Sequence, residues 1–334
     1  MVYEFALAMA ARGHVVHLYH VDFFQANVSR IEDIDWFTFS GDIVHHFQPP
    51  GPVDVDTIPA ADFIFGFAAD REMPPHAGLP VVLIQGYRML KGTAEQHAFQ
   101  APCPKICIAE WLVDIGRGLG VPDRQLVHIP LGLRHEKYNL RRPIADRPVR
   151  VSFCYSAHLQ KDAKLALDVL SRVKEAVPEV EVVVFGAVPP EHVVPDWMTY
   201  RTNPPQDELV DEIYNTSRVF LCTSKVEGFG LMSVEAMAGG AALVTTDNGG
   251  SRDYALHDQT ALVAPIGDAE GLAGHVVSLL RDHDRRVRIA TAGNTYVERF
   301  DWATSGEELE VFLERYLADP ASYGRVIGSG SVAK

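Results

Sequence analysis

The sequence predicts an α/β protein with two Rossmann-like domains whose parallel sheets face one another across a cleft. The chain has 334 residues, a length typical of two domains rather than one. Strand-length apolar runs alternate with helical patterns, and strands this apolar are typical of a parallel sheet covered on both faces. A polar, proline-bearing stretch at residues 134–150 separates two such regions, and we interpret it as the interdomain linker.

The first domain is predicted over residues 1–135. It opens with an amphipathic helix that runs into a strand, and the Arg12–His14 turn between them is interpreted as structural rather than catalytic. Further strand-like runs follow, namely DIVHHF, DFIFGFA, LPVVLIQGY, PKICIAEW and QLVHIPLG.

The second domain is predicted over residues 149–303. Its apolar strand-like runs lie at residues 149–156, 180–186, 218–224 and 241–247. Helical patterns separate them at residues 162–177 and 205–217, and a last long helix is predicted over 304–320. Two Rossmann-like halves leave a cleft between them, and open α/β sheets bind ligands at the carboxyl ends of their strands.

Composition excludes several classes of function. The formal net charge of −14 disfavours nucleic acid as a partner, because nucleic-acid binding needs a basic surface. No apolar run reaches the ~18 residues of a membrane span. Of the four cysteines, Cys103 and Cys107 form half of a zinc-like spacing without a second pair, so we expect reduced thiols and no metal. The Asp-Val-Asp of residues 54–56 imitates a metal motif but lies among prolines, so we interpret it as a solvated loop.

The stretch KVEGFGLMSVEAMAGG at residues 225–240 places a glycine-rich turn and a helix after a buried strand. The helix is predicted to begin near Leu231 and to end at Gly239 and Gly240. Glycines let a ligand approach the backbone, and the unpaired amides of the first helical turn attract phosphate. That attraction is worth only about 0.3–1 kcal/mol at an exposed helix end, so we expect a cation nearby.

Two acids accompany this turn. Glu227 lies in the turn, and Glu235 lies about one turn inside the helix on an otherwise apolar segment. A buried carboxylate is costly unless it accepts hydrogen bonds, which the paired hydroxyls of a ribose would donate. The pattern alone favours a nucleotide site no more than a capped surface helix with two solvated glutamates.

Residues 217–300 resemble the second half of the family-four retaining glycosyltransferases, which have the GT-B fold. The resemblance rests on EGFGLMSVEAMAGGAALVTTDNGG, with seven residues between the two acids, and on HDQTALVAPIGDAEGLAGHVVSLLRD after it. RFDWATSGEELEVFLERY resembles the family's closing helix, which crosses back to the first domain. In the first domain the resemblance is weaker and rests on EFALAMAARGHVVHLY.

The resemblance implies a hexosyltransferase-type enzyme that moves a sugar from a nucleotide-sugar donor to an acceptor. It implies retention of anomeric configuration, and it implies no metal and no cofactor beyond the nucleotide-sugar co-substrate. By this likeness Glu227 is the catalytic residue that contacts the donor sugar, and Glu235 holds the ribose. The family's contacts to the diphosphate and sugar come from the amides of Gly228, Phe229, Gly230 and Leu231. The base is expected near the strand around Phe185 and the segment around Arg201.

One departure from the family concerns the cations that contact the diphosphate. The family carries a glycine and an arginine, with a lysine five residues after the arginine, at the first strand of the second domain. Here the lysine is present as Lys161, whereas Tyr155 and Ser156 occupy the other two positions. His158 would substitute only if protonated. We therefore expect weak donor affinity or another basic residue in the gap, and a surface lysine that opens a helix is the competing interpretation of Lys161.

On the acceptor side, we expect residues at the strand ends of the first domain, with the candidates His45, His46, Phe67, Gln85 and Tyr87. A structural role is the competing interpretation of each, since strand histidines are more often packed than catalytic. The family also begins with a central strand and a glycine-rich loop before the helix that opens this sequence. Because that strand is central in a Rossmann-like sheet, we expect the sequence to start downstream of it.

The main alternative is a catalytically inactive GT-B protein that binds a nucleotide-sugar or a partner. A phosphorylase dependent on pyridoxal phosphate is disfavoured, because after Lys225 the sequence has only Lys334. A nicotinamide-dependent dehydrogenase lacks its glycine fingerprint near the start. The acceptor is expected to be a glycan, a lipid-linked molecule or a small molecule, in polysaccharide or glycoconjugate biosynthesis. We expect a cytoplasmic protein, peripheral at the inner membrane face if the acceptor is a lipid.

Overall fold

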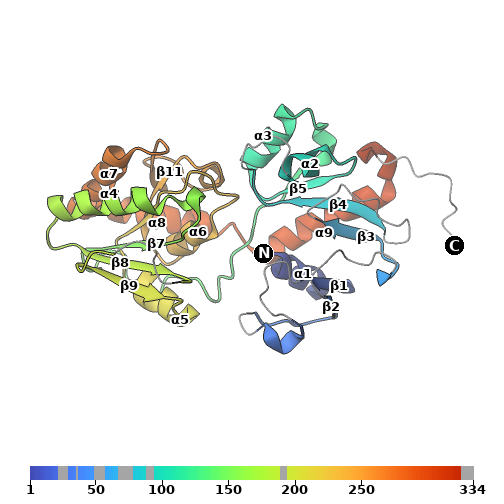
Figure 1. Ribbon diagram of the computed structural model, residues 1–334, viewed down its shortest axis with the longest axis horizontal. Helices are drawn as coiled ribbons and strands as arrows, with labels where there is room; N and C mark the ends of the chain where they lie inside the picture. Colours follow the sequence, from blue (N-terminus) through green and yellow to red (C-terminus); the bar gives the residue numbers. More distant parts are fainter. Residues whose placement is uncertain are drawn as a thin grey trace.

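The computed structural model describes residues 1–21, 29–34, 37–48, 57–66, 78–87, 94–188 and 194–324. Figure 1 shows two α/β domains side by side, joined by an extended linker and by a second crossing of the chain, which leads into the C-terminal helix on the first domain. Paired strands in the described sheets are parallel. The predicted α/β class with parallel sheets is therefore confirmed.

The first domain contains two separate sheets in its described part. One is two-stranded, β1-β2, and the other is four-stranded in the order β3-β4-β5-β6. The strands are β1 (Val16–Val21), β2 (Ile43–Gln48), β3 (Phe63–Gly66), β4 (Leu79–Ile84), β5 (Lys105–Cys107) and β6 (Leu126–His128). The α-helices are α1 (Val2–Ala11), α2 (Ala94–Gln100) and α3 (Glu110–Gly118), with short 3₁₀ helices η1 (Ile31–Asp33) and η4 (Asp123–Gln125).

The second domain has a six-stranded sheet in the order β12-β11-β10-β7-β8-β9. The strands are β7 (Arg150–Cys154), β8 (Glu181–Gly186), β9 (Met198–Thr202), β10 (Val219–Cys222), β11 (Ala242–Thr246) and β12 (Ala261–Ala264). The helices are η5 (Leu159–Lys161), α4 (Ala163–Ala176), α5 (Gln206–Glu208), η6 (Leu209–Tyr214), α6 (Leu231–Ala238), η7 (Gly250–Asp253), α7 (Ala269–Arg281) and α8 (His283–Val297).

The strand order of the second domain determines where a ligand can bind. The chain builds β7, β8 and β9 outward in one direction, then returns to place β10, β11 and β12 on the other side of β7. The order therefore reverses between β7 and β10, and open α/β sheets bind ligands at the carboxyl ends of strands at such a switch point. The segment with Lys161 follows β7, and the glycine turn of residues 228–230 follows β10.

The C-terminal helix α9 (Trp302–Ala318) returns to the first domain, where it lies against α1, and the short helix η8 (Pro320–Tyr323) follows it. It begins two residues before the predicted start at 304, because the Asp301 carboxylate accepts from the amides of Ala303 and Thr304 at 2.7 and 3.4 Å. Glu310 on α9 pairs with Arg12 and with His14, whose Nε2 lies 2.8 Å from a carboxylate oxygen. The turn from Arg12 to His14 thus has a structural partner.

Two predicted elements of the second domain need correction. Strand β9 was not among the predicted runs, because it is a half-exposed edge strand whose Met-Thr-Tyr-Arg-Thr sequence has little apolar signal. The helix predicted over 205–217 is shorter and ends as the π-helix η6, which closes at Tyr214. The change of helical pitch matters because the last residue of η6, Tyr214, is a buried residue of the candidate site.

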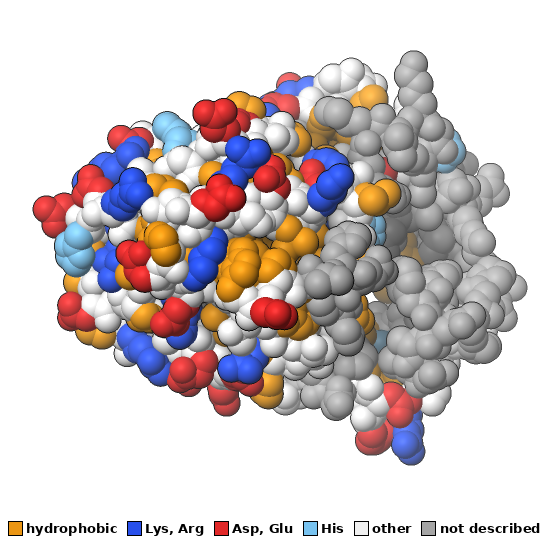
Figure 2. Space-filling model, turned by 60° about the vertical axis from the view of Figure 1, so that its left-hand side comes forward, with side chains coloured by type: hydrophobic (Ala, Val, Ile, Leu, Met, Phe, Trp, Pro, Cys, Tyr) orange, Lys and Arg blue, Asp and Glu red, His pale blue; other side chains and the backbone are white. Residues whose placement is uncertain are grey.

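The surface of the second domain carries both signs of charge. Figure 2 shows acidic and basic side chains interspersed on this face, without a continuous basic patch. Among the described helices, none has the length and apolar character needed to span a membrane.

Candidate active site

The glycine turn predicted from the sequence follows β10 and leads into α6, as expected. Gly230 has a φ of 96°, a left-handed conformation that glycine adopts readily. The Glu227 amide donates to the Asn248 carbonyl at 3.0 Å, and the Gly250 amide donates to the Glu227 carbonyl at 3.2 Å. The turn is therefore tied to the segment that follows β11.

Beneath the turn, Phe229 is buried and serves packing. Its ring meets Tyr254 and Phe300 edge to face, at centroid distances of 5.6 and 5.2 Å. The Tyr254 hydroxyl donates to the carbonyl of Phe229 at 3.0 Å. Of the predicted donor contacts, Phe229 can therefore offer its backbone but not its side chain.

Glu227 lies beside Lys161, which brings together an acid and a cation predicted separately. Lys161 Nζ donates to Glu227 Oε1 at 2.6 Å, and the Ser224 hydroxyl donates to the same oxygen at 2.6 Å. The Glu227 side chain is 12% exposed and that of Lys161 37%. Burial disfavours the charged lysine, but the attraction of Glu227 outweighs it and the pKa of Lys161 is raised. Lys161 is thus part of the site rather than a solvated surface lysine.

Glu235 lies on α6 in a contrasting environment of tyrosines. The Tyr214 hydroxyl donates to Glu235 Oε2 at 2.9 Å, and the Tyr138 hydroxyl of the linker also interacts with this carboxylate. Burial raises the pKa of Glu235 to about 7, although both hydroxyls act in the opposite direction. Glu235 therefore changes charge near neutral pH.

The first domain contacts the turn at Gly228. The indole Nε1 of Trp111, on α3, donates to the Gly228 carbonyl at 2.9 Å. On its other side Gly228 packs against the backbone carbonyl of Gln85, where any Cβ at this position would overlap with that oxygen. The glycine is therefore required by the close approach of the first domain as well as by any ligand.

Two other predicted donor residues have different partners in the described structure. Ser156 is half-buried, and its hydroxyl accepts from the His158 amide at 3.2 Å. Arg201 is 55% exposed and lies 3.5 Å from Glu208. It lines a cavity of about 600 Å³ whose lining includes neither Glu227 nor Glu235. Neither residue supplies the missing second cation in the described structure.

The candidate acceptor residues lie in different environments. His45 Nδ1 lies 2.9 Å from His20 Nε2, and His46 Nε2 lies 2.9 Å from His17 Nδ1, so both pair with β1. Tyr87 is buried and packs edge to face on Phe99, which is a core role.

Gln85 is the candidate that lies at the donor turn, through its backbone and with an exposed side chain. Phe67 lies outside the described residues, as do the acids of residues 54–56. Within the described ranges, no cluster of three or more His, Cys, Asp or Glu side chains is arranged for a metal.

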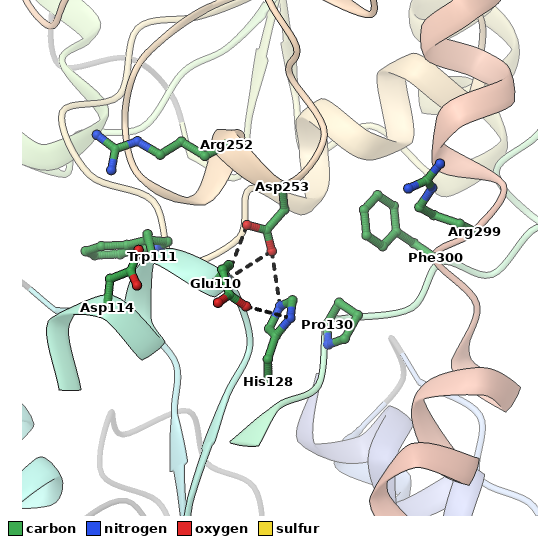
Figure 3. A pocket seen from close by; sticks show the side chains of 9 residues that line it. All are labelled: Glu110, Trp111, Asp114, His128, Pro130, Arg252, Asp253, Arg299 and Phe300. Carbon is green, nitrogen blue, oxygen red and sulfur yellow. Dashed lines mark hydrogen bonds and ion pairs between the residues drawn. The ribbon is translucent and has the colours of Figure 1, made fainter. Parts of the chain in front are cut away.

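A cavity of about 490 Å³ lies between the domains next to Trp111, and Figure 3 shows the side chains around it. His128 lies between two acids, with Nδ1 3.2 Å from Glu110 and Nε2 3.2 Å from Asp253. Asp253, from the second domain, also accepts from the Glu110 amide at 3.2 Å, at the start of α3. Burial opposes the charged imidazole, but Asp253 and Glu110 outweigh it and raise the pKa of His128.

The residues that the sequence did not reveal are Ser224, Tyr214, Tyr138 and Trp111. Of these, only Ser224 is close in sequence to Glu227. Its place at the end of a strand, three residues before that acid, could have indicated its role. The other three come from a helix, the linker and the opposite domain. Their roles depend on packing that no local pattern reports.

Two Rossmann-like domains whose parallel sheets face a shared interface, with acids and a glycine turn at a switch point, define the GT-B class of fold. The fold is shared with sucrose-phosphate synthase from Thermosynechococcus elongatus, at a TM-score of 0.71 and 16% identity over 95% of this chain and 92% of that one. It is shared with HepE from Anabaena, solved in complex with UDP and glucose, at a TM-score of 0.66 and 14% identity over 82% and 87%.

Residues 141–295, somewhat less than half of the chain, match the family model described as glycosyl transferases group 1. The chain is similar to phosphatidyl-myo-inositol mannosyltransferase of Mycobacterium leprae, with 35% identity over 83 residues, which is 25% of this chain and 22% of that relative. It is also similar to sulfoquinovosyl transferase of Arabidopsis thaliana, with 28% identity over 144 residues, which is 41% and 28% of the two chains. These matches agree with the glycosyltransferase resemblance predicted from the sequence, and the chain matches less than a third of the length of these two relatives.

Proposed function

We propose that this protein is a retaining glycosyltransferase that moves a sugar from a nucleotide-sugar donor to an acceptor hydroxyl. The observation that carries the proposal is the placement of two carboxylates on one turn-helix unit at the switch point of the second domain. Glu227 is paired with Lys161 at 2.6 Å, and Glu235 is held by tyrosine hydroxyls. Structural glutamates on a surface helix would have no need of these partners.

Each part of the donor has a chemical counterpart in this arrangement. The ribose hydroxyls would donate to Glu235 in its ionised form. The diphosphate would meet the first amides of α6 and Lys161, because both supply positive charge. Glu227 would then face the sugar from the side of the turn.

In the proposed reaction the acceptor oxygen forms a bond with the anomeric carbon while the bond from that carbon to the diphosphate breaks. The departing diphosphate takes the proton of the acceptor hydroxyl, so no separate base is required. No metal is invoked, since Lys161 and the helix end would stabilise the leaving negative charge. The absence of an arginine at Ser156 leaves one cation fewer than the family pattern, and we expect weak donor affinity.

The identity of donor and acceptor is proposed only by class. The similar mycobacterial protein is named a mannosyltransferase of phosphatidyl-myo-inositol, and the Arabidopsis protein a sulfoquinovosyl transferase. A nucleotide-hexose donor and a glycan, lipid-linked or small-molecule acceptor agree with this range. A cytoplasmic location, at the inner membrane face for a lipid acceptor, stays part of the proposal.

The experiment that tests this function is nucleotide release from UDP-glucose, GDP-mannose and ADP-glucose, with and without an acceptor extract. Release that depends on acceptor extract and on Glu227 would support the transferase. Calorimetric binding of a nucleoside diphosphate without any release would instead favour the inactive sugar-nucleotide-binding protein. Failure of all three nucleotides to bind would rule out both.

A further inference from the structure

Trp111 belongs to the first domain but bonds to the donor turn of the second. It lies in the first turn of α3, is 8% exposed, and donates from Nε1 to the Gly228 carbonyl at 2.9 Å. Gly228 directly follows Glu227, the acid proposed to face the sugar. An interdomain hydrogen bond is therefore attached to the backbone one residue from the proposed catalytic carboxylate.

We propose that Trp111 is a positioning residue of the donor site, which holds the turn of residues 227–230 in its sugar-facing geometry from across the domain interface. The proposal rests on the proposed function for its effect on catalysis. The side chains that bond to Glu227 are those of Lys161 and Ser224. Both lie in the same domain as Glu227 and orient its carboxylate. Trp111 acts instead on the backbone that carries it.

The indole also contacts the neighbouring segment, which makes the contact more than one hydrogen bond. The Trp111 ring lies over Gly249, where an added Cβ would lie 2.8 Å from Cδ2 of the indole. Gly249 follows β11 and is bridged to Glu227 in a parallel pairing. One side chain of the first domain thus contacts both segments of the second domain that shape the turn, and a Cβ at Gly249 would crowd the indole.

The position of Trp111 is itself determined by the interface. Asp253 of the second domain accepts from the Glu110 amide at the start of α3, and His128 lies 3.2 Å from the same carboxylate (Figure 3). Separation of the two domains would break these contacts together with the bond to Gly228. Contact between the domains therefore supplies the support that the turn receives from Trp111.

The decisive experiment compares Trp111→Phe with Trp302→Phe as a matched control. Trp302 packs on Phe5 at a centroid distance of 5.1 Å and has no part in the donor site. Among UDP-glucose, GDP-mannose and ADP-glucose, the donor that is turned over fastest is used. We expect W111F to lower kcat about tenfold, while KM for the donor changes by less than about twofold, because the lost bond to the part-buried Gly228 carbonyl removes support from the turn that carries Glu227. W302F should leave both constants unchanged. Equal kcat values for the two variants would overturn the proposal.

A second measurement does not require activity and remains informative if W111F fails to fold. In the wild-type protein, the indole N–H of Trp111 should exchange with solvent at least about tenfold more slowly than the indole N–H of Trp302, by NMR on a protein labelled with ¹⁵N. Exchange as fast as that of Trp302 would overturn the proposal. If no nucleotide-sugar is turned over but the indole is protected, the proposed function fails while the interdomain contact stands.

Discussion

The two acids of the donor turn belong to one strand-turn-helix unit but have opposite surroundings. Glu227 is bonded to a cation and a hydroxyl, Lys161 and Ser224, each at 2.6 Å. Glu235 is bonded to Tyr214 at 2.9 Å and has its pKa raised to about 7 by burial. The difference separates their proposed tasks, because a charged pair suits the sugar and the diphosphate that leaves it, and a carboxylate held by neutral hydroxyls suits the hydroxyls of a ribose.

The comparison also explains why each acid tolerates burial. A buried carboxylate needs a counter-charge or hydrogen-bond donors; Glu227 has both, whereas Glu235 has tyrosine hydroxyls. At the proposed sugar end, the attraction of Glu227 outweighs the effect of burial and raises the pKa of Lys161. At the nucleoside end the carboxylate stays close to the point of protonation, which makes it sensitive to its ligand.

The largest expected effect is the loss of turnover when Glu227 is changed. Glu227→Ala and Glu227→Gln should lower kcat at least about a hundredfold, because a charge aimed at the reacting sugar is removed. Nucleoside diphosphate should still bind in calorimetry. Glu310→Gln is a matched control, because Glu310 is, like Glu227, bonded to a cation. Its second partner is a histidine, and it lies on α9, away from the turn. Turnover by the Glu227 variants at the rate of this control would refute the catalytic role.

A smaller loss is expected at the nucleoside end. Glu235→Ala should weaken nucleoside diphosphate binding by ~1.5–3 kcal/mol, the cost of a charge-assisted hydrogen bond. Calorimetry with UDP, GDP and ADP measures this difference. Unchanged affinity would remove Glu235 from the ribose role and leave the comparison of the two acids without a basis.

The pKa of Glu235 gives a pH dependence with a definite sign. Its pKa is raised to about 7, so the ribose-accepting carboxylate is lost as pH falls through that value. Affinity for the nucleoside diphosphate should fall about tenfold between pH 8 and pH 6. The free energy of unfolding of the unliganded protein depends on pH in the opposite direction. The stability contributed by the protonated Glu235 carboxyl is lost as pH rises through about 7. An affinity that is flat over this range would contradict the assignment.

The linker tyrosine sharpens that test. Tyr138 interacts with the Glu235 carboxylate and lowers its pKa. Tyr138→Phe should therefore shift the midpoint of the pH profile upward, whereas Tyr296→Phe, on a ring stacked by Arg299, should not. Identical midpoints in the two variants would show that the linker has no part in the nucleoside end.

The smallest effect is expected at the domain interface. The pKa of His128 is raised by Asp253 and Glu110 against the effect of burial, so its stabilising contact is complete at low pH and is lost as pH rises through its folded pKa. His128→Gln should lower the free energy of unfolding by less than about 1 kcal/mol at pH 5.5, with a smaller effect at pH 8.5. Thermal unfolding of both proteins at both pH values measures this. A larger loss at pH 8.5 than at pH 5.5 would contradict the sign.

Much of the second domain was accessible to sequence reasoning. The helix predicted from Leu231 to the glycines is α6 (Leu231–Ala238), and Lys161 does meet Glu227. Edge strand β9 was missed because exposed positions carry no apolar pattern. The first-domain candidates were less informative, since His45 and His46 bond to β1 and, among the candidates that the structure describes, Gln85 alone meets the turn.

The sequence by itself determined the fold class, the resemblance to glycosyltransferases and the two acids of the candidate site, because these depend on periodicity and on residues close together in the chain. Only the tertiary structure decided what surrounds the acids. Tyr138, Tyr214 and Trp111 reach the site from the linker, a neighbouring helix and the opposite domain. Hydrogen bonds and pKa values depend on distances of a few ångströms, and for residues far apart in sequence the packing of the folded chain determines those distances.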